Sequence, residues 1–152
     1  MSETDSVRSR TSSHTTGDQT TDVDLAQELG FSQGQYVQEI GYDEDIDFDF
    51  RNAVERILGE DLADEDVNDV FDAVLMWWRS DDPDLVDALV DAQTMLGSDG
   101  VVWLLTPKPK RAGHIPPADI SEAAPVAGMH VTTTISAAAD WSGTRLVAKK
   151  RS

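Results

Sequence analysis

The feature that most constrains this chain is a short apolar run just after residue 100. Val101 to Leu105 is apolar at every position and rich in strand-forming residues, and Gly100 and Thr106-Pro107 bound it. A strand that is apolar on both faces is typical of the centre of a parallel sheet. A basic loop, 108–111, follows directly, and in open α/β sheets ligands gather outside the carboxyl ends of the strands. The run therefore predicts both a fold class and a place for a site.

Strand-like and helix-like segments alternate on both sides of this run. Before it, the expected segments are a short helix capped by Asp24 and ended by Gly30, a strand at 35–40, a helix at 50–58 ended by Gly59, a short helix from about Asp64, a strand at 71–78, and a helix capped by Asp82 and ended by Gly97. After it, they are a helix from Pro116-Pro117 through Ala124 that Pro125 breaks or kinks, and hairpin strands at 130–137 and 144–149 with Trp141 to Gly143 at their turn. This order predicts an α/β domain with a mainly parallel sheet that ends in an antiparallel hairpin.

The chain has 152 residues and no cysteine, which excludes disulfides and thiolate metal sites. Residues 1–22 are polar and lack the apolar residues needed to offset the entropy of ordering, so they are expected to form a disordered tail. The remaining residues, 23–151, are expected to form a single domain. Neither a membrane-spanning run nor the apolar core of a signal peptide is apparent, which favours a cytoplasmic protein.

Charge is distributed unevenly along the sequence. The net charge is −17, and residues 22–99 carry 23 acidic residues and only three basic ones. Nucleic acid is therefore not expected as a partner, because phosphate binding needs a clustered basic surface. An acidic surface can serve solubility alone, or it can recognise another protein. The sequence does not indicate an oligomeric state.

The loops that follow the parallel strands are expected to meet at one edge of the sheet, because right-handed crossovers place them there. These loops and the hairpin turn carry the candidate contact residues, namely Asp43, Glu44, Asp45, Arg79, Lys108, Lys110, Arg111 and Trp141. The acids at 43–49 are expected to cap the following helix and to pair with the basic residues of 108–111. This edge is the predicted binding surface.

Other chemistry is weakly indicated. Alternating acids at 43, 45, 47 and 49 suggest a divalent-ion site, but a calcium loop starting at Asp45 lacks the required Gly and Glu. The basic loop with Gly113 and His114 is an alternative anion site, although it contains no phosphate-binding motif. Two histidines, His114 and His130, are too few for a convincing metal or catalytic set. No catalytic residues, metal or cofactor are assigned from these patterns.

Several motifs together resemble an actinobacterial family known as domain of unknown function 3052. They are LGFSQGQYVQEIGYDED (29–45), FDAVLMWWR (71–79), DLVDALVDA (84–92), DGVVWLLTPK (99–108), DISEAAPVAG (119–128) and DWSGTRLV (140–147). The resemblance implies a three-layer, Rossmann-like fold of the methyltransferase type with no established activity. In that fold the first strand leads into a glycine-rich cofactor loop.

The chain departs from the methyltransferase pattern at that loop. Such a loop needs several glycines so that the backbone can approach the cofactor, but here only Gly41 is present and 42–45 adds three carboxylates. The favoured hypothesis is a regulatory or adaptor module without catalysis. The alternative is a methyltransferase that uses S-adenosylmethionine, or a small-anion-binding enzyme, at the same edge. An open cleft beside Gly41 would favour the enzyme, and a cleft filled by Tyr42 or Trp141 would oppose it.

Overall fold

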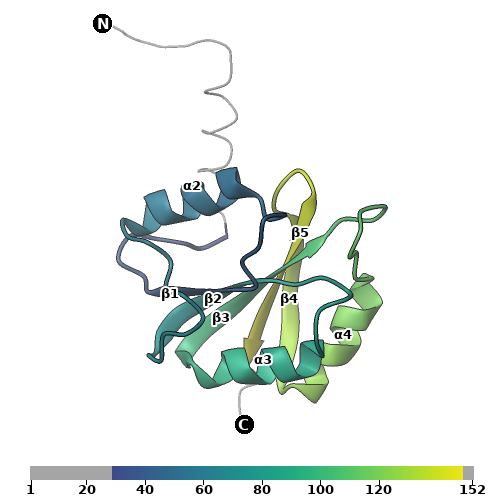
Figure 1. Ribbon diagram of the computed structural model, residues 1–152. Helices are drawn as coiled ribbons and strands as arrows, with labels where there is room; N and C mark the ends of the chain where they lie inside the picture. Colours follow the sequence, from purple (N-terminus) through teal and green to yellow (C-terminus); the bar gives the residue numbers. More distant parts are fainter. Residues whose placement is uncertain (1–28, 149–152) are drawn as a thin grey trace, which may run out of the picture.

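The computed structural model describes residues 29–148, which form a five-stranded sheet with three helices against it (Figure 1). The strands are β1 (Val37–Ile40), β2 (Phe71–Trp77), β3 (Leu96–Pro107), β4 (Met129–Ser136) and β5 (Trp141–Ala148). The helices are α2 (Phe48–Leu58), α3 (Leu85–Thr94) and α4 (Pro117–Val126). The predicted tail at 1–22 and the start of the helix predicted at Asp24 lie outside the described residues.

The sheet has the strand order β1-β2-β3-β5-β4. β1 pairs with β2 and β2 with β3 in parallel, whereas β5 is antiparallel to both β3 and β4. The apolar run at 101–105 therefore lies in the central strand, as its sequence predicts. The α/β fold with a terminal antiparallel hairpin is confirmed.

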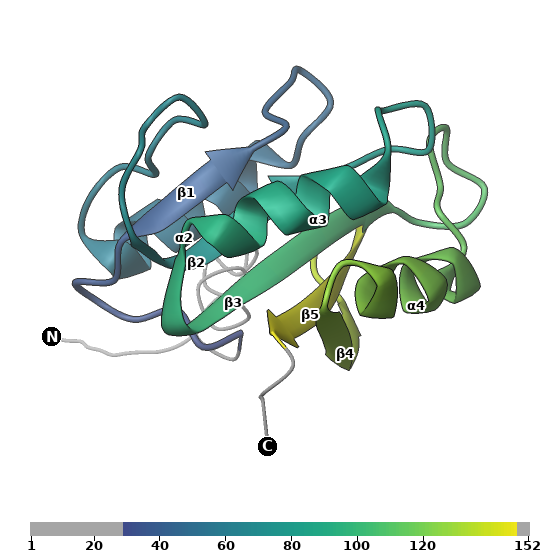
Figure 2. The same cartoon turned by 90° about the horizontal axis from the view of Figure 1, so that it is seen from below.

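The helices cover both faces of the sheet and produce three layers. α2 lies on one face, and α3 and α4 lie side by side on the other (Figures 1 and 2). Alternate residues of β2 supply the two cores: Leu75 and Trp77 pack with α2, while Val74 and Met76 pack with the other two helices. In the described part of the chain, no helix is long and apolar enough to cross a membrane.

α2 ends where the sequence predicts, and it begins at Phe48, two residues before the predicted start at Phe50. The Asp47 carboxylate accepts a hydrogen bond from the Phe50 N–H at 2.8 Å, which caps α2. Gly59 ends the helix with φ 82°, a left-handed conformation that glycine adopts without strain. The expectation that an acid of 43–49 caps this helix is confirmed for Asp47.

The bounds predicted for α3 are wrong at both ends. Asp84, not Asp82, caps the helix, because the Asp82 carboxylate accepts a hydrogen bond from the Arg79 N–H at 2.8 Å and closes the preceding turn. At the other end, Leu96 already pairs with Phe71 as part of β3. The sheet pairing therefore ends the helix before Gly97.

The short helix predicted from Asp64 is absent, and a single bridge followed by a turn takes its place. Ala63 forms a single parallel bridge with Gln38 on the outer side of β1. The buried Gln38 side chain then donates to the carbonyls of Asp64, Glu65 and Val67 at 3.0–3.4 Å. Because these carbonyls already have a donor, the segment does not need helical hydrogen bonds.

Two predictions near the C-terminus are also corrected. α4 passes through Pro125 and ends after Val126, because a proline in the last turn removes only one backbone donor. The hairpin turn lies at 137–140 and not at Trp141 to Gly143. Trp141 begins β5 and pairs with Pro107.

Candidate functional site

The ends of β1 and β2 meet at Gly41. This glycine has φ 79°, and a Cβ atom placed on it would lie 2.0 Å from the carbonyl oxygen of Trp77. No other residue fits this position without moving the backbone. The single glycine that remains of the expected cofactor loop therefore serves close packing of two strand ends.

Arg79 fills the space directly beside Gly41. Its Nη1 donates to the Gly41 carbonyl at 2.8 Å and to the Trp77 carbonyl at 3.2 Å. Its Nε donates to Asp45 Oδ2 at 3.0 Å, and its Nη2 pairs with Asp45 Oδ1. The guanidinium also lies over the Trp141 ring, 5.3 Å from the centroid, and only 11% of the side chain is exposed. The side chain thus joins both strand ends to the acidic loop.

The pair of Arg79 and Asp45 is held in its charged form. The hydrogen bond from Arg79 lowers the pKa of Asp45, although partial burial opposes the shift. For Arg79, burial favours the neutral form, but the hydrogen bond and charge of Asp45 outweigh burial and raise the pKa. Both groups are therefore ionised at neutral pH.

A second network lies on the other side of Trp77. Glu39, in β1, is only 6% exposed, and the single Arg51 Nε–H is shared between its two carboxylate oxygens, at 2.9 and 3.0 Å. The Trp77 indole Nε1 donates to the same carboxylate at 3.1 Å. Arg51 also lies over the exposed Tyr42 ring, 5.2 Å from the centroid. The hydrogen bond with Glu39 raises the pKa of Arg51 against the effect of burial.

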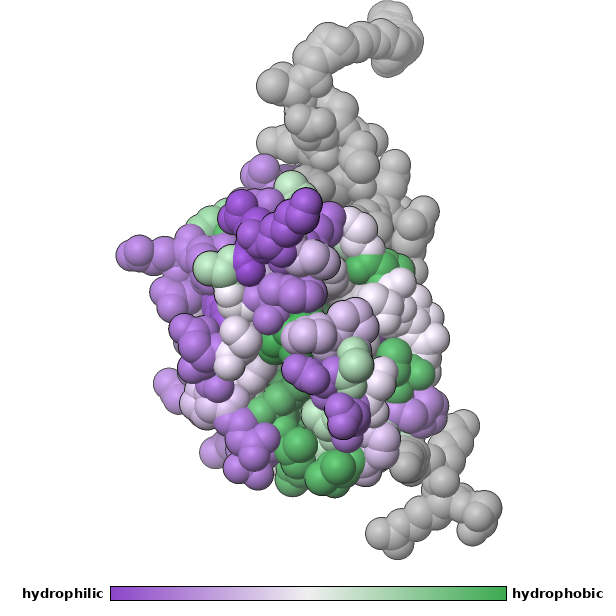
Figure 3. Space-filling view, turned by 90° about the vertical axis from the view of Figure 1, so that its right-hand side faces the viewer, coloured by the Kyte–Doolittle hydropathy of each residue, from purple (hydrophilic) through white to green (hydrophobic). Residues whose placement is uncertain are grey.

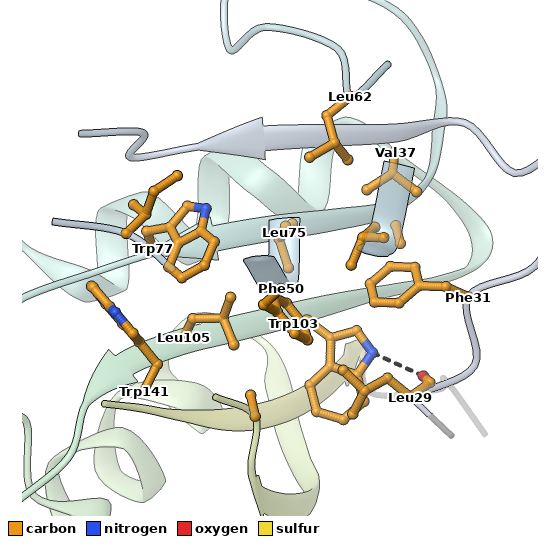
Figure 4. Packing of buried hydrophobic residues seen from close by; sticks show 14 of the residues in the cluster. Leu29, Phe31, Val37, Phe50, Leu62, Leu75, Trp77, Trp103, Leu105 and Trp141 are labelled. Atoms are coloured by element: carbon orange, nitrogen blue, oxygen red, sulfur yellow. Dashed lines mark hydrogen bonds between the residues drawn. The ribbon is translucent and has the colours of Figure 1, made fainter. Parts of the chain in front are cut away.

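Two tryptophans connect the networks. Trp77 and Trp141 pack edge to face, with ring centroids 4.9 Å apart, in the core cluster that faces α2 (Figure 4). The prediction that Trp141 lies at the hairpin turn is wrong. Trp141 is the first residue of β5, and it is buried. Trp78, the residue after Trp77, packs on the opposite face of the sheet, as the alternation of side chains along a strand requires.

The sequence did not single out Glu39 or Arg51. Their only signal is an acid inside the strand-like segment QYVQEI and a base in the first half of the next helix. An acid at that position needs a buried partner, but the sequence does not show which base α2 turns toward it.

Of the eight residues predicted for the contact surface, the structure gathers five. Asp45, Arg79, Lys110, Arg111 and Trp141 lie together, and all except Arg79 line a hollow of about 290 Å³. Asp43 and Glu44 are exposed on the adjoining loop. Lys108 does not join the group, because its Nζ donates to Ser136 Oγ at 2.6 Å.

The predicted pairing between the acids of 43–49 and the loop 108–111 is not observed. Asp45 pairs with Arg79, and Arg111 pairs with Asp140 at 3.4 Å. In residues 29–148, no three acidic or histidine side chains are close enough together to hold a metal ion. His114 donates from Nδ1 to the Pro107 carbonyl at 2.8 Å, since a carbonyl can only accept.

Solved structures show the same fold with very different sequences. The pyocyanin biosynthetic protein PhzM has a TM-score of 0.64 and 11% identity over 84% of this chain and 54% of its own. The methyltransferase CcbJ of Streptomyces caelestis has a TM-score of 0.58 and 9% identity over 85% and 89%. An S-adenosylmethionine-dependent methyltransferase of Aquifex aeolicus has a TM-score of 0.55 and 12% identity over 82% and 88%. At these identities the likeness shows the methyltransferase-like fold alone.

Sequence relatives cover most of the domain. Uncharacterized proteins of Mycobacterium tuberculosis and Mycobacterium bovis are 49% identical over 125 residues, which span 82% of this chain and 78% of each relative. The family described as protein of unknown function (DUF3052) matches residues 26–150. The chain therefore belongs to the DUF3052 family, on a methyltransferase-like α/β fold.

Proposed function

We propose that this chain is a protein-binding module, without methyl-transfer activity, on a methyltransferase-like fold. The observation that carries the proposal is the position of Arg79. Its guanidinium fills the space beside Gly41, where the glycine-rich loop of a methyltransferase would meet its cofactor. The sequence identified Tyr42 or Trp141 as side chains that could fill this place; Arg79 does so, with Trp141 stacked against it.

A cofactor that entered beside Gly41 would have to displace Arg79 from two carbonyls and a carboxylate. Charge-assisted hydrogen bonds of this kind stabilise a structure more than neutral ones do, and an unpaired Asp45 would remain. The nearby carboxylates of Asp43 and Glu44 would further oppose the anionic end of such a cofactor. Both effects support a binding role over catalysis.

The proposed contact surface surrounds the 290 Å³ hollow. Asp43, Glu44 and Asp45 contribute negative charge on one side, and Lys110 and Arg111 contribute positive charge on the other. Trp141 lines the hollow, and the largely buried Arg79 supports the surface through its bonds to Asp45. A partner that presents charges of both signs fits this arrangement, and its association would be sensitive to salt.

The absence of a cofactor function is tested by thermal unfolding of the full chain with S-adenosylmethionine and its demethylated product. A ligand at 100 times its dissociation constant stabilises a protein by about 2.7 kcal/mol, which raises the midpoint by several degrees in a domain of this size. We expect no shift at millimolar ligand. A saturable shift would make the acidic loop part of an unusual cofactor site and would support the enzyme alternative.

The binding role is tested by charge reversal. Lys108, Lys110 and Arg111 are changed together to Glu, and a control variant carries the same three changes at Lys149, Lys150 and Arg151. Both variants change the net charge equally, so a general effect of charge affects both alike. We expect the first variant to lose salt-sensitive partners that the wild type and the control retain. An identical set of partners for all three proteins contradicts the proposed surface.

A further inference from the structure

The face of the sheet that carries α3 and α4 changes character toward the carboxyl end of β3. Val102 and Leu146, which pair across β3 and β5, belong to the apolar core. Two residues further along each strand, Leu104 pairs with Thr144, and the next pair on this face is Thr106 with Ser142. Thr134 of β4 pairs with Thr144 and extends the polar row. Hydroxyl groups therefore replace hydrocarbon at one end of a buried sheet face.

These hydroxyl-bearing residues form one wall of a hollow of about 170 Å³. Ile115, Ile120 and Pro117 line it from the loop after β3 and from α4. Figure 3 looks at this side of the molecule, where recessed hydrophobic side chains lie between hydrophilic ones. The hollow thus has a polar floor on the sheet and an apolar cover.

Two of the floor hydroxyls belong to buried residues and have no hydrogen-bond partner among the described residues. Thr106 is 2% exposed and Thr144 is 3% exposed, and neither hydroxyl is hydrogen-bonded to any group of residues 29–148. In that part of the chain, Gln93 Oε1 is the only side-chain polar atom that is both fully enclosed and without a hydrogen-bond partner. The two threonine oxygens, which also have no partner there, are therefore not fully enclosed. Both residues line the hollow, so a water or ligand held there is the available partner for their hydroxyls. Buried polar groups without a partner are unfavourable unless water or a ligand satisfies them.

The lining also defines the charge of a matching ligand. Asp, Glu, Lys and Arg are absent from the described residues around the hollow. His114, which also lines it, has its proton on Nδ1 toward the Pro107 carbonyl, so in the neutral ring Nε2 is an acceptor. A charged ligand would lose its hydration without gaining a counter-charge. An uncharged ligand that can both donate and accept hydrogen bonds fits the lining best.

The size of the hollow restricts the ligand further. An apolar cavity of about 150 Å³ accepts benzene, whereas pockets for drug-sized molecules are roughly 300 to 1,000 Å³. We propose that the hollow between α4 and the ends of β3 and β5 binds a small uncharged molecule of about one ring. Its hydroxyl or carbonyl group bonds to Thr106 and Thr144, and its apolar part packs on Ile115 and Ile120. This site is separate from the surface proposed for protein binding.

The probe is phenol, which has one ring and one group that both donates and accepts. Amide and methyl spectra of the isotopically labelled full chain are recorded during a titration with phenol, with toluene and benzoate as matched comparators. We expect saturable shifts at Thr106, Thr144 and Ile120 with a dissociation constant of about 1 mM or tighter. Toluene, which lacks the hydroxyl, and benzoate, which carries a charge, should bind at least about fivefold more weakly.

Two variants in the hollow and one control outside it locate the binding. Thr144→Val removes the hydroxyl while preserving shape, and we expect it to weaken phenol binding about fivefold. Thr133→Val, on the exposed edge strand outside the hollow, should leave binding unchanged. Ser121→Phe, at an exposed rim position of α4, should block the hollow even if Thr144→Val perturbs the fold. Shifts that do not saturate, that map elsewhere, or that are unaffected by both Thr144→Val and Ser121→Phe overturn the proposal and leave a hollow that holds only water.

Discussion

Two regions at the same end of the sheet differ in how their polar groups are satisfied. At the closed region, around Gly41, Arg79 and Arg51 saturate the strand-end carbonyls and two carboxylates. At the open region, beneath α4, the hydroxyls of Thr106 and Thr144 have no partner within residues 29–148. The regions are adjacent, since Trp141 belongs to the first and Ser142 to the second.

Strand alternation separates the two regions. Neighbouring residues of β5 point to opposite faces, so one supports an ion-pair network while the next lines a hollow. A network whose members are mutually satisfied stabilises the fold and resists a ligand, because the ligand must displace existing bonds. A ligand that bonds to hydroxyls without a partner does not have to displace an existing hydrogen bond. The position of a site therefore depends on which polar groups the fold leaves free.

The largest effect is expected from removing the indole that joins the closed region. Trp77→Ala creates a cavity in the core that faces α2 and removes a donor from Glu39, so we expect a loss of about 3 to 5 kcal/mol in the free energy of unfolding. Urea denaturation measures it. The control is Trp78→Ala on the other face, where the half-buried indole should cost less. Equal losses in unfolding free energy for the two variants would show that the closed region contributes no more to stability than the opposite face of the sheet.

Breaking the buried ion pair is expected to come next. Arg51→Met leaves Glu39 buried without its partner, and we expect a loss of about 2 to 3 kcal/mol, less than for a fully buried pair because Arg51 is partly exposed. Adding Glu39→Gln removes the stranded charge and should recover about half of the loss. If the double variant is no more stable than Arg51→Met, the unpaired charge of Glu39 is not the cause of the loss.

A smaller, pH-dependent effect is expected for Asp45. Its pKa is lowered in the folded state, so the stabilisation is complete above the unfolded value of about 3.9 and is lost as the pH falls through the folded value. Because the carboxylate is more than half exposed, we expect Asp45→Asn to cost at most about 1 kcal/mol at pH 7. Urea denaturation at pH 7 and pH 3 should show a smaller difference from wild type at pH 3. The same difference in stability between the variant and wild type at pH 7 and at pH 3 would contradict the pairing of Asp45 with Arg79.

The smallest effect is expected in the open region. Thr144→Val removes a hydroxyl that has no partner in the described part of the chain, so we expect a change in the free energy of unfolding within about 0.5 kcal/mol. Denaturation without ligand checks this. A loss above about 1.5 kcal/mol would mean that the hydroxyl is engaged in the fold, and the contrast between the regions would fail.

The sequence predicts the fold well because burial on two faces leaves a clear pattern. The run at 101–105 predicts the central strand, and Phe50 to Leu58 predicts the helix that covers one face. Predictions based on capping were less secure, since Asp82 and Asp84 are equally suited to cap α3. Only the hydrogen bond from the Arg79 N–H to Asp82 decides between them.

The candidate site was predictable only where strand order determines it. Parallel strands bring Asp45 and Arg79 to one edge, as expected from the sequence. The partner of Glu39 depends on the rotation of α2, which periodicity does not specify. The open hollow was not predicted, because Thr106 and Thr144 are also ordinary strand-forming residues.

We propose that Arg79 closes the space beside Gly41 to a cofactor, while the hollow beneath α4 is open to a ligand. The most direct test of this proposal is one set of amide spectra of the labelled full chain, titrated separately with S-adenosylmethionine and with phenol. We expect no saturable shift at Gly41, Asp45 or Arg79 with S-adenosylmethionine, and saturable shifts at Thr106 and Thr144 with phenol. Saturable shifts beside Gly41 with S-adenosylmethionine would contradict the proposal.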